Sequence, residues 1–188
     1  MPSFAKIKSV NKTARNSGAV GKNAIVPRIV EKLAGVKDKI LDFGSGPKAI
    51  HTQSLRAKGL NVIAHEIGEN RNLEIHDQNA LRRKYDVVFG SNVVNVQPDM
   101  EMFVWTIRKM QKAVRKAGIL IVNLPTSPNK LGITRIRISK ELRLYFSRVN
   151  VVCRNGTWVF VATRGILYLN LSSILGGDVN YIEGFDVN

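Results

Sequence analysis

Residues 39–66, KILDFGSGPKAIHTQSLRAKGLNVIAHE, constrain the fold of this chain more than any other segment. A short apolar run leads into a turn with two glycines, a segment that can form a helix follows, and a second apolar run ends at Glu66. Glycines in such a turn let a ligand approach the backbone, and an acid after the next strand can accept two ribose hydroxyls. The segment therefore predicts a nucleoside-cofactor site at the edge of a parallel sheet.

The turn differs from the dinucleotide-binding pattern G-x-G-x-x-G, which has a third glycine. Gly44 and Gly46 are followed by Pro47, and position 49 is Ala. The sequence also lacks the phosphate-binding pattern G-x-x-x-x-G-K-[ST]. A cofactor without a pyrophosphate suits this turn better. An ordinary strand-to-helix turn of another α/β protein is the alternative interpretation.

The pattern D-x-G-x-G, with an acid about 20 residues further on, resembles motif I of the class I S-adenosylmethionine-dependent methyltransferases. The order of predicted elements over residues 24–164 resembles the same family, and the chain also resembles unassigned phage-type members of it. This resemblance implies an α/β fold in a single domain, with a Rossmann-like, doubly wound, mostly parallel sheet and a C-terminal antiparallel hairpin. It also implies S-adenosylmethionine as the cofactor.

The rest of the chain supplies elements that fit such a sheet. Apolar residues at helical spacing predict helices, and continuous apolar runs predict buried strands. A weak strand ending at Asp77 would make five parallel strands, and the tail after Arg164 would cover a sheet edge or form an oligomer contact. The clearer predictions are helices at 24–34, at 99–116 and from Ser139, strands at 85–89 and 118–125, and a hairpin at 149–164 that turns at Asn155-Gly156.

The chain has 188 residues and an apolar fraction of 44%, which fits a single globular domain. Residues 1–22 are polar and basic and predict a flexible arm, which leaves 23–188 as the domain proper. No run approaches the roughly 18 apolar residues that a membrane span needs, and the N-terminus has no signal-peptide core. We therefore expect a cytoplasmic protein, in the host cytoplasm if it is viral. Cys153 lies in an apolar run and is expected to be a thiol buried in the core. The three histidines lack the spacing of metal ligands, so no metal site is expected.

The resemblance carries specific roles onto this sequence. The glycines of the turn would let the backbone lie against the cofactor, and Asp42 or its neighbours would hold the ammonium group of the cofactor, directly or through water. Glu66 matches the acid that accepts the ribose hydroxyls, with Glu69 as a rival, and Asp77 matches the acid near the adenine amine. The expected cofactor-binding residues are Asp42, Gly44, Gly46, Glu66, Asp77 and Ser91.

The methyl group should be presented where the strand at 85–89 ends. Amino-methyltransferases of adenine carry [DNS]-P-P-[YFW] there, whereas this chain has Ser91-Asn92-Val93-Val94. This departure counts against a standard adenine or glutamine acceptor. Ser91 and Asn92, together with Asn123 after the next strand, are the residues expected to hold the acceptor. The missing Pro-Pro pair indicates either an acceptor other than such an amine or loss of activity.

The charge points to nucleic acid. The chain has 29 Lys and Arg against 14 Asp and Glu, a net charge of +15, and such an excess attracts polyanions. The expected nucleic-acid contacts are Lys12, Arg15, Lys22, Lys130, Arg135 and Arg137. We therefore expect methyl transfer to nucleic acid, with a DNA base favoured and RNA possible. The alternatives are a small-molecule or protein methyltransferase and a non-catalytic nucleic-acid-binding protein on this fold, and the oligomeric state stays open.

Overall fold

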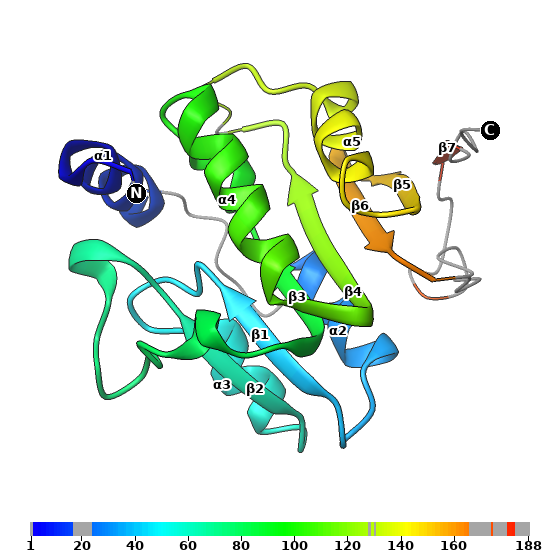
Figure 1. The fold of residues 1–188 in the computed structure, drawn as a ribbon, viewed down its shortest axis with the longest axis horizontal. Helices are drawn as coiled ribbons and strands as arrows, with labels where there is room; N and C mark the ends of the chain where they lie inside the picture. Colours follow the sequence, from blue (N-terminus) through cyan, green and yellow to red (C-terminus); the bar gives the residue numbers. More distant parts are fainter. Residues whose placement is uncertain are drawn as a thin grey trace.

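The computed structural model describes residues 2–16, 24–127, 129, 131–165, 174 and 180–182. Its seven strands form one mixed sheet in the order β2-β1-β3-β4-β6-β5-β7 (Figure 1). The four strands β2, β1, β3 and β4 run parallel, and β6, β5 and β7 are paired antiparallel. The strands are β1 (Lys39–Phe43), β2 (Asn61–His65), β3 (Tyr85–Gly90), β4 (Val114–Leu124), β5 (Arg148–Arg154), β6 (Thr157–Thr163) and β7 (Asn180–Ile182).

Helices cover both faces of this sheet, so the doubly wound prediction is confirmed. Helices α2 and α3 lie on one face, and α4 and α5 lie on the other (Figure 1). The helices are α1 (Phe4–Asn16), α2 (Ile25–Leu33), α3 (Ile50–Arg56), α4 (Met100–Ala113) and α5 (Arg135–Arg143), with short 3₁₀ turns η1 (Gly68–Asn70), η2 (Ala80–Arg82) and η3 (Val94–Val96).

The strands contribute alternate residues to two apolar cores. In β3, Val87 and Phe89 pack with α2 and α3, whereas Val88 packs with α4 and α5. Because both faces of the central strands are buried, their sequences are continuous apolar runs rather than alternating ones. This packing fixes the carboxyl ends of β1, β3 and β4 at one edge of the sheet.

The fifth parallel strand expected before Asp77 does not form, and this prediction was wrong. Residues 71–79 are turns, in which the His76 amide donates to the Asn72 carbonyl at 2.8 Å. The segment is too polar to be buried between two helical layers. The Asp77 amide nevertheless donates to the Ala64 carbonyl at 3.0 Å, so the segment still follows the exposed edge of β2.

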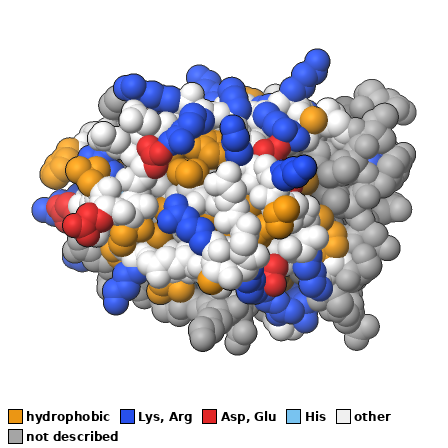
Figure 2. Space-filling view, turned by 90° about the horizontal axis from the view of Figure 1, so that it is seen from below, with side chains coloured by type: hydrophobic (Ala, Val, Ile, Leu, Met, Phe, Trp, Pro, Cys, Tyr) orange, Lys and Arg blue, Asp and Glu red, His pale blue; other side chains and the backbone are white. Residues whose placement is uncertain are grey.

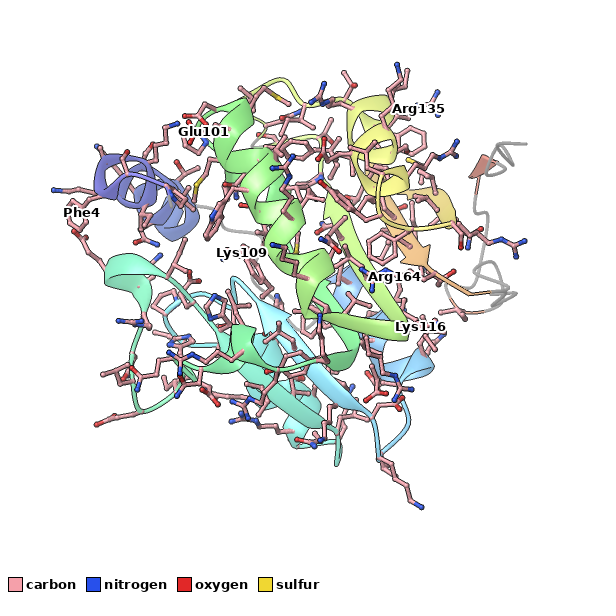
Figure 3. All side chains as sticks on the ribbon, in the orientation of Figure 1. Phe4, Glu101, Lys109, Lys116, Arg135 and Arg164 are labelled. Carbon is pink, nitrogen blue, oxygen red and sulfur yellow. The ribbon has the colours of Figure 1, made fainter. Side chains whose placement is uncertain are left out.

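Two helix boundaries also differ from the sequence prediction. Helix α4 ends at Ala113 rather than 116, because Val114 pairs with Tyr85 and Arg164 caps the helix end (Figure 3). The Arg164 guanidinium donates to the Gln111 and Val114 carbonyls at 3.0 and 3.1 Å. Helix α5 begins at Arg135, earlier than expected, because the side chain of Thr134 caps it.

Residues 4–16 form helix α1, where the sequence predicted a flexible arm. Lys6 anchors this helix to the start of α4, with its ammonium 3.1 Å from the Asp99 carboxylate and in contact with Glu101. The domain boundary at residue 22 stays a prediction, because 17–23 are outside the described residues. None of the helices in the described part of the chain has the length and apolar character that a membrane span requires.

The C-terminal tail supplies one further strand. Strand β7 pairs with β5 through Val151 and Ile182, so this part of the tail covers the sheet edge, one of the two roles expected for it. The remainder of the tail, apart from Gly165 and Ile174, lies outside the described residues.

Candidate active site

The glycine turn lies at the end of β1, and its backbone is held by the end of β2. The Gly44 and Ser45 amides donate to the His65 carbonyl at 2.8 and 3.1 Å. Gly44 and Gly46 have φ values of +70° and +74°, in the left-handed region that favours glycine. A Cβ at Gly44 would lie 2.8 Å from Cγ2 of Val93, whereas a Cβ at Gly46 would have nothing within 4 Å. Gly44 is therefore needed for packing inside the chain, and Gly46 leaves open space beside the turn.

Glu66 ties this turn to the strand that follows it. Its Oε2 accepts from the Gly46 amide and its Oε1 from the Ile67 amide, both at 2.8 Å. Burial raises the pKa of the Glu66 carboxyl, and these two hydrogen bonds oppose the rise. A carboxylate has about four acceptor positions, so both oxygens can still accept from a ligand. The Nε2 atom of His76 lies 3.0 Å from the Gly46 carbonyl and fixes the other side of the turn.

Two of the acids assigned by resemblance lie away from the open space. Asp42 is 1% exposed, and its Oδ2 accepts from the Thr52 hydroxyl at 2.8 Å. Burial raises the pKa of Asp42 to about 7, although the Thr52 hydrogen bond opposes this. Asp77 accepts from the Asn79 amide at 2.7 Å and pairs with Arg83. Neither acid lines the cavities described next, and their cofactor roles stay predictions.

A small cavity lies between the turn and helix α1, and we call it the inner cavity. Its volume is about 40 Å³, which is room for a few water molecules. It is lined by residues of α1, of the β1 and β2 ends, of the β3–α4 loop and of α4, among them Val10, Gly44, His65, Glu66, Asn92 and Trp105. Helix α1 closes this side through Asn11, whose Nδ2 donates to the Ile67 carbonyl at 3.1 Å and whose Oδ1 accepts from the Glu69 amide at 3.0 Å.

His65 lines the inner cavity and is 7% exposed. Neither of its ring nitrogens has a hydrogen-bond partner among the described residues. Burial, with smaller contributions from nearby cationic groups, lowers the pKa of the ring to about 4. The ring is therefore neutral near pH 7 and presents one donor and one acceptor. A buried polar group without a partner is costly, so His65 fits a cavity that receives a polar ligand.

A larger cavity lies on the other side of the β3 end, and we call it the outer cavity. Its volume is about 450 Å³, within the range of small-molecule sites. It is lined by the start of α2, the ends of β3 and β4 and the β5–β6 hairpin, including Arg28, Ser91, Asn92, Asn123, Arg154 and Thr157. Asn92 lines both cavities, so they adjoin at this residue.

The structure brings the three expected acceptor residues together, but two of them bond to each other. The backbone N–H of Asn92 donates to Oδ1 of Asn123 at 2.7 Å, and Nδ2 of Asn123 donates to Oδ1 of Asn92 at 2.8 Å. Asn92 has φ +57°, a conformation that asparagine tolerates better than most residues. The amide pair therefore fixes the ends of β3 and β4 relative to each other, and Ser91 lies beside it on the outer cavity.

The expected nucleic-acid contacts are not gathered at this site. Lys12 is exposed on α1, while Arg135 stacks 4.9 Å from the Trp158 ring and Arg137 lies 3.8 Å from Glu141. Helices α1 and α5 lie on opposite sides of α4 (Figures 1 and 3). Lys and Arg side chains are spread over the face shown in Figure 2 rather than collected in one patch. Lys22, Lys130 and the side chain of Arg15 are outside the described residues.

Similarity to solved structures agrees with this geometry. The chain has the fold of the class I S-adenosylmethionine-dependent methyltransferases. A TehB-like methyltransferase from Corynebacterium glutamicum matches 87% of this chain and 100% of its own, with 13% identity and a TM-score of 0.59. PigF with SAH matches 86% of this chain and 62% of its own, with 15% identity and a TM-score of 0.57.

A third structure comes from natural-product chemistry. CalO1, a methyltransferase in calicheamicin biosynthesis in its SAH-bound form, matches 76% of this chain and 54% of its own, with 15% identity and a TM-score of 0.53. A scan against protein-family models and a search of curated protein sequences both found no match. The similarity is therefore one of fold.

Several residues of the site carried no signal in the sequence. Asn11, His65 and Thr52 act through contacts that depend on the folded chain, and none of them is a defining position of the motif D-x-G-x-G or of the acid that follows it. Arg28 was detectable in principle, because a cation in the first turn of a helix opposes the helix dipole. Arg154 belongs to the basic segment 130–154, but its place at a cavity follows only from the hairpin.

Proposed function

We propose that this chain is an S-adenosylmethionine-dependent methyltransferase whose acceptor occupies the outer cavity. One observation carries the proposal. The inner cavity, beside the glycine turn and Glu66, adjoins the polar outer cavity at Asn92. Both lie at the carboxyl ends of parallel strands, where β1 and β3 lead to opposite sides of the sheet and ligands of this fold bind.

The residues of the inner cavity fit the nucleoside part of this cofactor. Glu66 has acceptor positions left for hydroxyl donors, and His65 offers a buried donor and acceptor without partners among the described residues. Gly46 leaves space beside the turn. The cavity of about 40 Å³ is smaller than a nucleoside, so we infer that α1 moves outward when the cofactor binds.

S-adenosylmethionine, when bound, supplies an electrophilic methyl group on a positively charged sulfur. That chemistry would be transfer of the methyl group to an acceptor oxygen or nitrogen, which would lose its proton to water, with S-adenosylhomocysteine as the second product. Ser91 and the locked pair Asn92–Asn123 would orient the acceptor, and orientation alone can supply much of the rate of such a transfer.

A small molecule is the acceptor that the outer cavity favours, since its volume of about 450 Å³ is typical of small-molecule sites. Nucleic acid is the second candidate, and the net charge of +15 favours it. A DNA or RNA base would have to leave its stack to enter the cavity. A phage origin and a cytoplasmic location stay predictions from the sequence.

The proposal is tested by transfer of a tritiated methyl group from S-adenosylmethionine to four fractions in parallel: metabolite extract, unmethylated DNA, total RNA and protein. Calorimetry with S-adenosylhomocysteine measures cofactor-site binding separately. Glu66→Gln should weaken S-adenosylhomocysteine binding and reduce methyl transfer, and the exposed Glu74→Gln serves as the matched control. Labelled metabolites support the favoured acceptor, and labelled DNA or RNA supports the second candidate. Absence of S-adenosylhomocysteine binding would overturn the proposal.

A further inference from the structure

We propose that the outer cavity binds its acceptor through a negatively charged group, a carboxylate or a phosphate, held between Arg28 and Arg154. This inference rests on the proposed function, because it treats the outer cavity as the acceptor site. The two arginines come from the start of α2 and from the end of β5, segments far apart in the sequence that line one cavity.

The charge of the cavity wall points to an anion. Besides the two arginines, the described lining residues are two apolar residues at the start of α2, a proline and the uncharged polar residues Ser91, Asn92, Asn123, Asn155 and Thr157. No Asp or Glu lines it among the described residues. Arginine presents planar pairs of N–H groups that match carboxylate and phosphate oxygens. A carboxylate or phosphate in this cavity would meet the two guanidinium groups and several uncharged polar side chains.

The start of α2 adds a second attraction of the same sign. Ala24 and Ile25 line the cavity at the first turn of this nine-residue helix. The first amides of a helix lack intrahelical partners and carry a partial positive charge. No side chain caps this end among the described residues, and the first turn contains no acid. These amides are therefore suited to an anion.

Arg28 lies where the helix itself disfavours a cation. It follows Pro27 in the first turn of α2, and a positive charge there opposes the helix dipole. It makes no ion pair or hydrogen bond with another described residue that would offset this. An anion between Arg28 and the helix start would interact favourably with the guanidinium and with the positive end of the helix dipole. Ligand binding would therefore explain a cation at a position where it does not stabilise the fold.

Arg154 is the last residue of β5 and is held by the β5–β6 hairpin. It pairs with Thr157 at the end of the β5–β6 hairpin, whose turn is Asn155-Gly156. The Thr126 hydroxyl donates to the Gly156 carbonyl at 3.2 Å and ties this turn to the segment after β4. The hairpin therefore holds the stem of Arg154 at a set distance from the ends of β3 and β4.

A carboxylate could also come from the methionine part of the cofactor. The arginines line only the outer cavity, whereas Glu66 and His65 line only the inner one. This separation favours the acceptor as the source. The two sources differ in one measurable respect, because an anion that belongs to the acceptor must bind together with S-adenosylhomocysteine rather than compete with it.

Nuclear magnetic resonance on ¹⁵N-labelled full-length protein tests the inference. Inorganic phosphate is titrated with and without saturating S-adenosylhomocysteine, followed by 4-hydroxybenzoate and its neutral analogue 4-hydroxybenzamide. The signals to follow are the Nε–H groups of Arg28 and Arg154 and the amide of Ile25. We expect saturable shifts with phosphate and the benzoate, weaker ones with the benzamide, and the same midpoint in the presence of S-adenosylhomocysteine.

Arg28→Gln and Arg154→Gln should each weaken phosphate binding about tenfold, the effect of losing one charge-assisted hydrogen bond. Lys116→Gln is the matched control, because it removes one positive charge at the opposite end of β4 (Figure 3). The spectrum of each variant reports whether it is folded. Equal weakening by Lys116→Gln would reduce the effect to net charge and overturn the inference.

The remaining outcomes separate this inference from the proposed function. Phosphate binding without S-adenosylhomocysteine binding would support the anion site and refute the methyltransferase. S-adenosylhomocysteine binding without phosphate shifts would support the methyltransferase and refute the anion site. Competition between the two ligands would assign the arginines to the cofactor's carboxylate and overturn the inference. A single-stranded oligonucleotide that shifts these signals at much lower concentration than phosphate would replace the small acceptor with nucleic acid.

Discussion

The inner and outer cavities adjoin at Asn92 but are built in different ways. The polar groups around the inner cavity are buried, and Glu66 and His76 already bond to the backbone of the glycine turn. The outer cavity is about 450 Å³ against about 40 Å³ and presents cationic side chains, among them the exposed Arg28. The polar groups of the inner cavity are therefore held in place before a ligand binds, while the outer one is a cationic cavity that can fit different acceptors.

The buried His65 and Glu66 line the inner cavity, and the buried Asp42 lies in β1 just before the glycine turn without lining either cavity. Burial raises the pKa of Asp42 to about 7 from an ordinary value of 3.8. Between these values the unfolded chain releases a proton that the folded chain keeps, so this group lowers stability as pH rises from 4 to 7. Asp42→Asn keeps an acceptor for Thr52 and removes the titration.

The stability of Asp42→Asn relative to the original protein should therefore increase between pH 4 and pH 7, by on the order of 4 kcal/mol. Urea unfolding at intervals of pH measures the difference. His65 acts in the opposite direction, because burial lowers its pKa to about 4 and the unfolded ring takes up a proton first as pH falls below 6.5. Parallel stability curves for the two proteins would contradict the prediction for Asp42.

Glu66→Gln should separate the two cavities by ligand. A glutamine has one acceptor oxygen for the two backbone amides of Gly46 and Ile67, and the loss of a hydrogen bond to a charged group costs about 1.5–3 kcal/mol. We expect S-adenosylhomocysteine affinity to fall about 10- to 100-fold, with phosphate affinity at Arg28 unchanged. Calorimetry with each ligand measures both. An equal loss of the two affinities would mean that the cavities are not independent.

The same contrast explains how much could be predicted from the sequence. The β1–α3–β2 unit was predictable because its apolar runs, glycines and final acid are local signals. The layers followed from the alternation of strands and helices, and the outer residues Ser91, Asn92 and Asn123 followed from the ends of β3 and β4. They do lie together.

The rest depended on contacts between distant parts of the chain. Residues 4–16 contain charges and few large apolar side chains, so the pattern favoured a flexible arm. Their helix docks through Asn11 on Ile67, an amide contact across 56 positions that no periodicity encodes. The strand before Asp77 was predicted from a segment of weak apolar content, and this segment forms turns instead because it is too polar to be buried between two helical layers.

Two glycines with similar backbones test whether the open space beside the turn receives a ligand. Gly46 and Gly59 have φ values of +74° and +83°, and neither has an atom within 4 Å of an added Cβ. Gly46→Ala and Gly59→Ala should each lose about 1–2 kcal/mol of stability to backbone strain. Only Gly46→Ala should also weaken S-adenosylhomocysteine binding, by about tenfold, as measured by calorimetry. Equal affinities in the two variants would remove the turn from the cofactor site.

The smallest expected effect concerns α1, which covers the inner cavity and not the outer one. Asn11→Ala removes the hydrogen bonds to the Ile67 carbonyl and the Glu69 amide, and this should weaken docking of α1 by about 1 kcal/mol. If α1 must move before the cofactor enters, a shift of that size raises the open population and the association rate about fivefold.

Stopped-flow fluorescence of Trp105, which lines the inner cavity, measures this rate with S-adenosylhomocysteine. Lys12→Gln is the control, because Lys12 is the next residue along α1 and is exposed. Phosphate binding at Arg28 should be the same in all three proteins, since α1 does not line the outer cavity. A slower association in Asn11→Ala would mean that docked α1 forms part of the bound state. The inner cavity would then enlarge by movement of the β3–α4 loop around Val93, whose Cγ2 would lie 2.8 Å from a Cβ at Gly44.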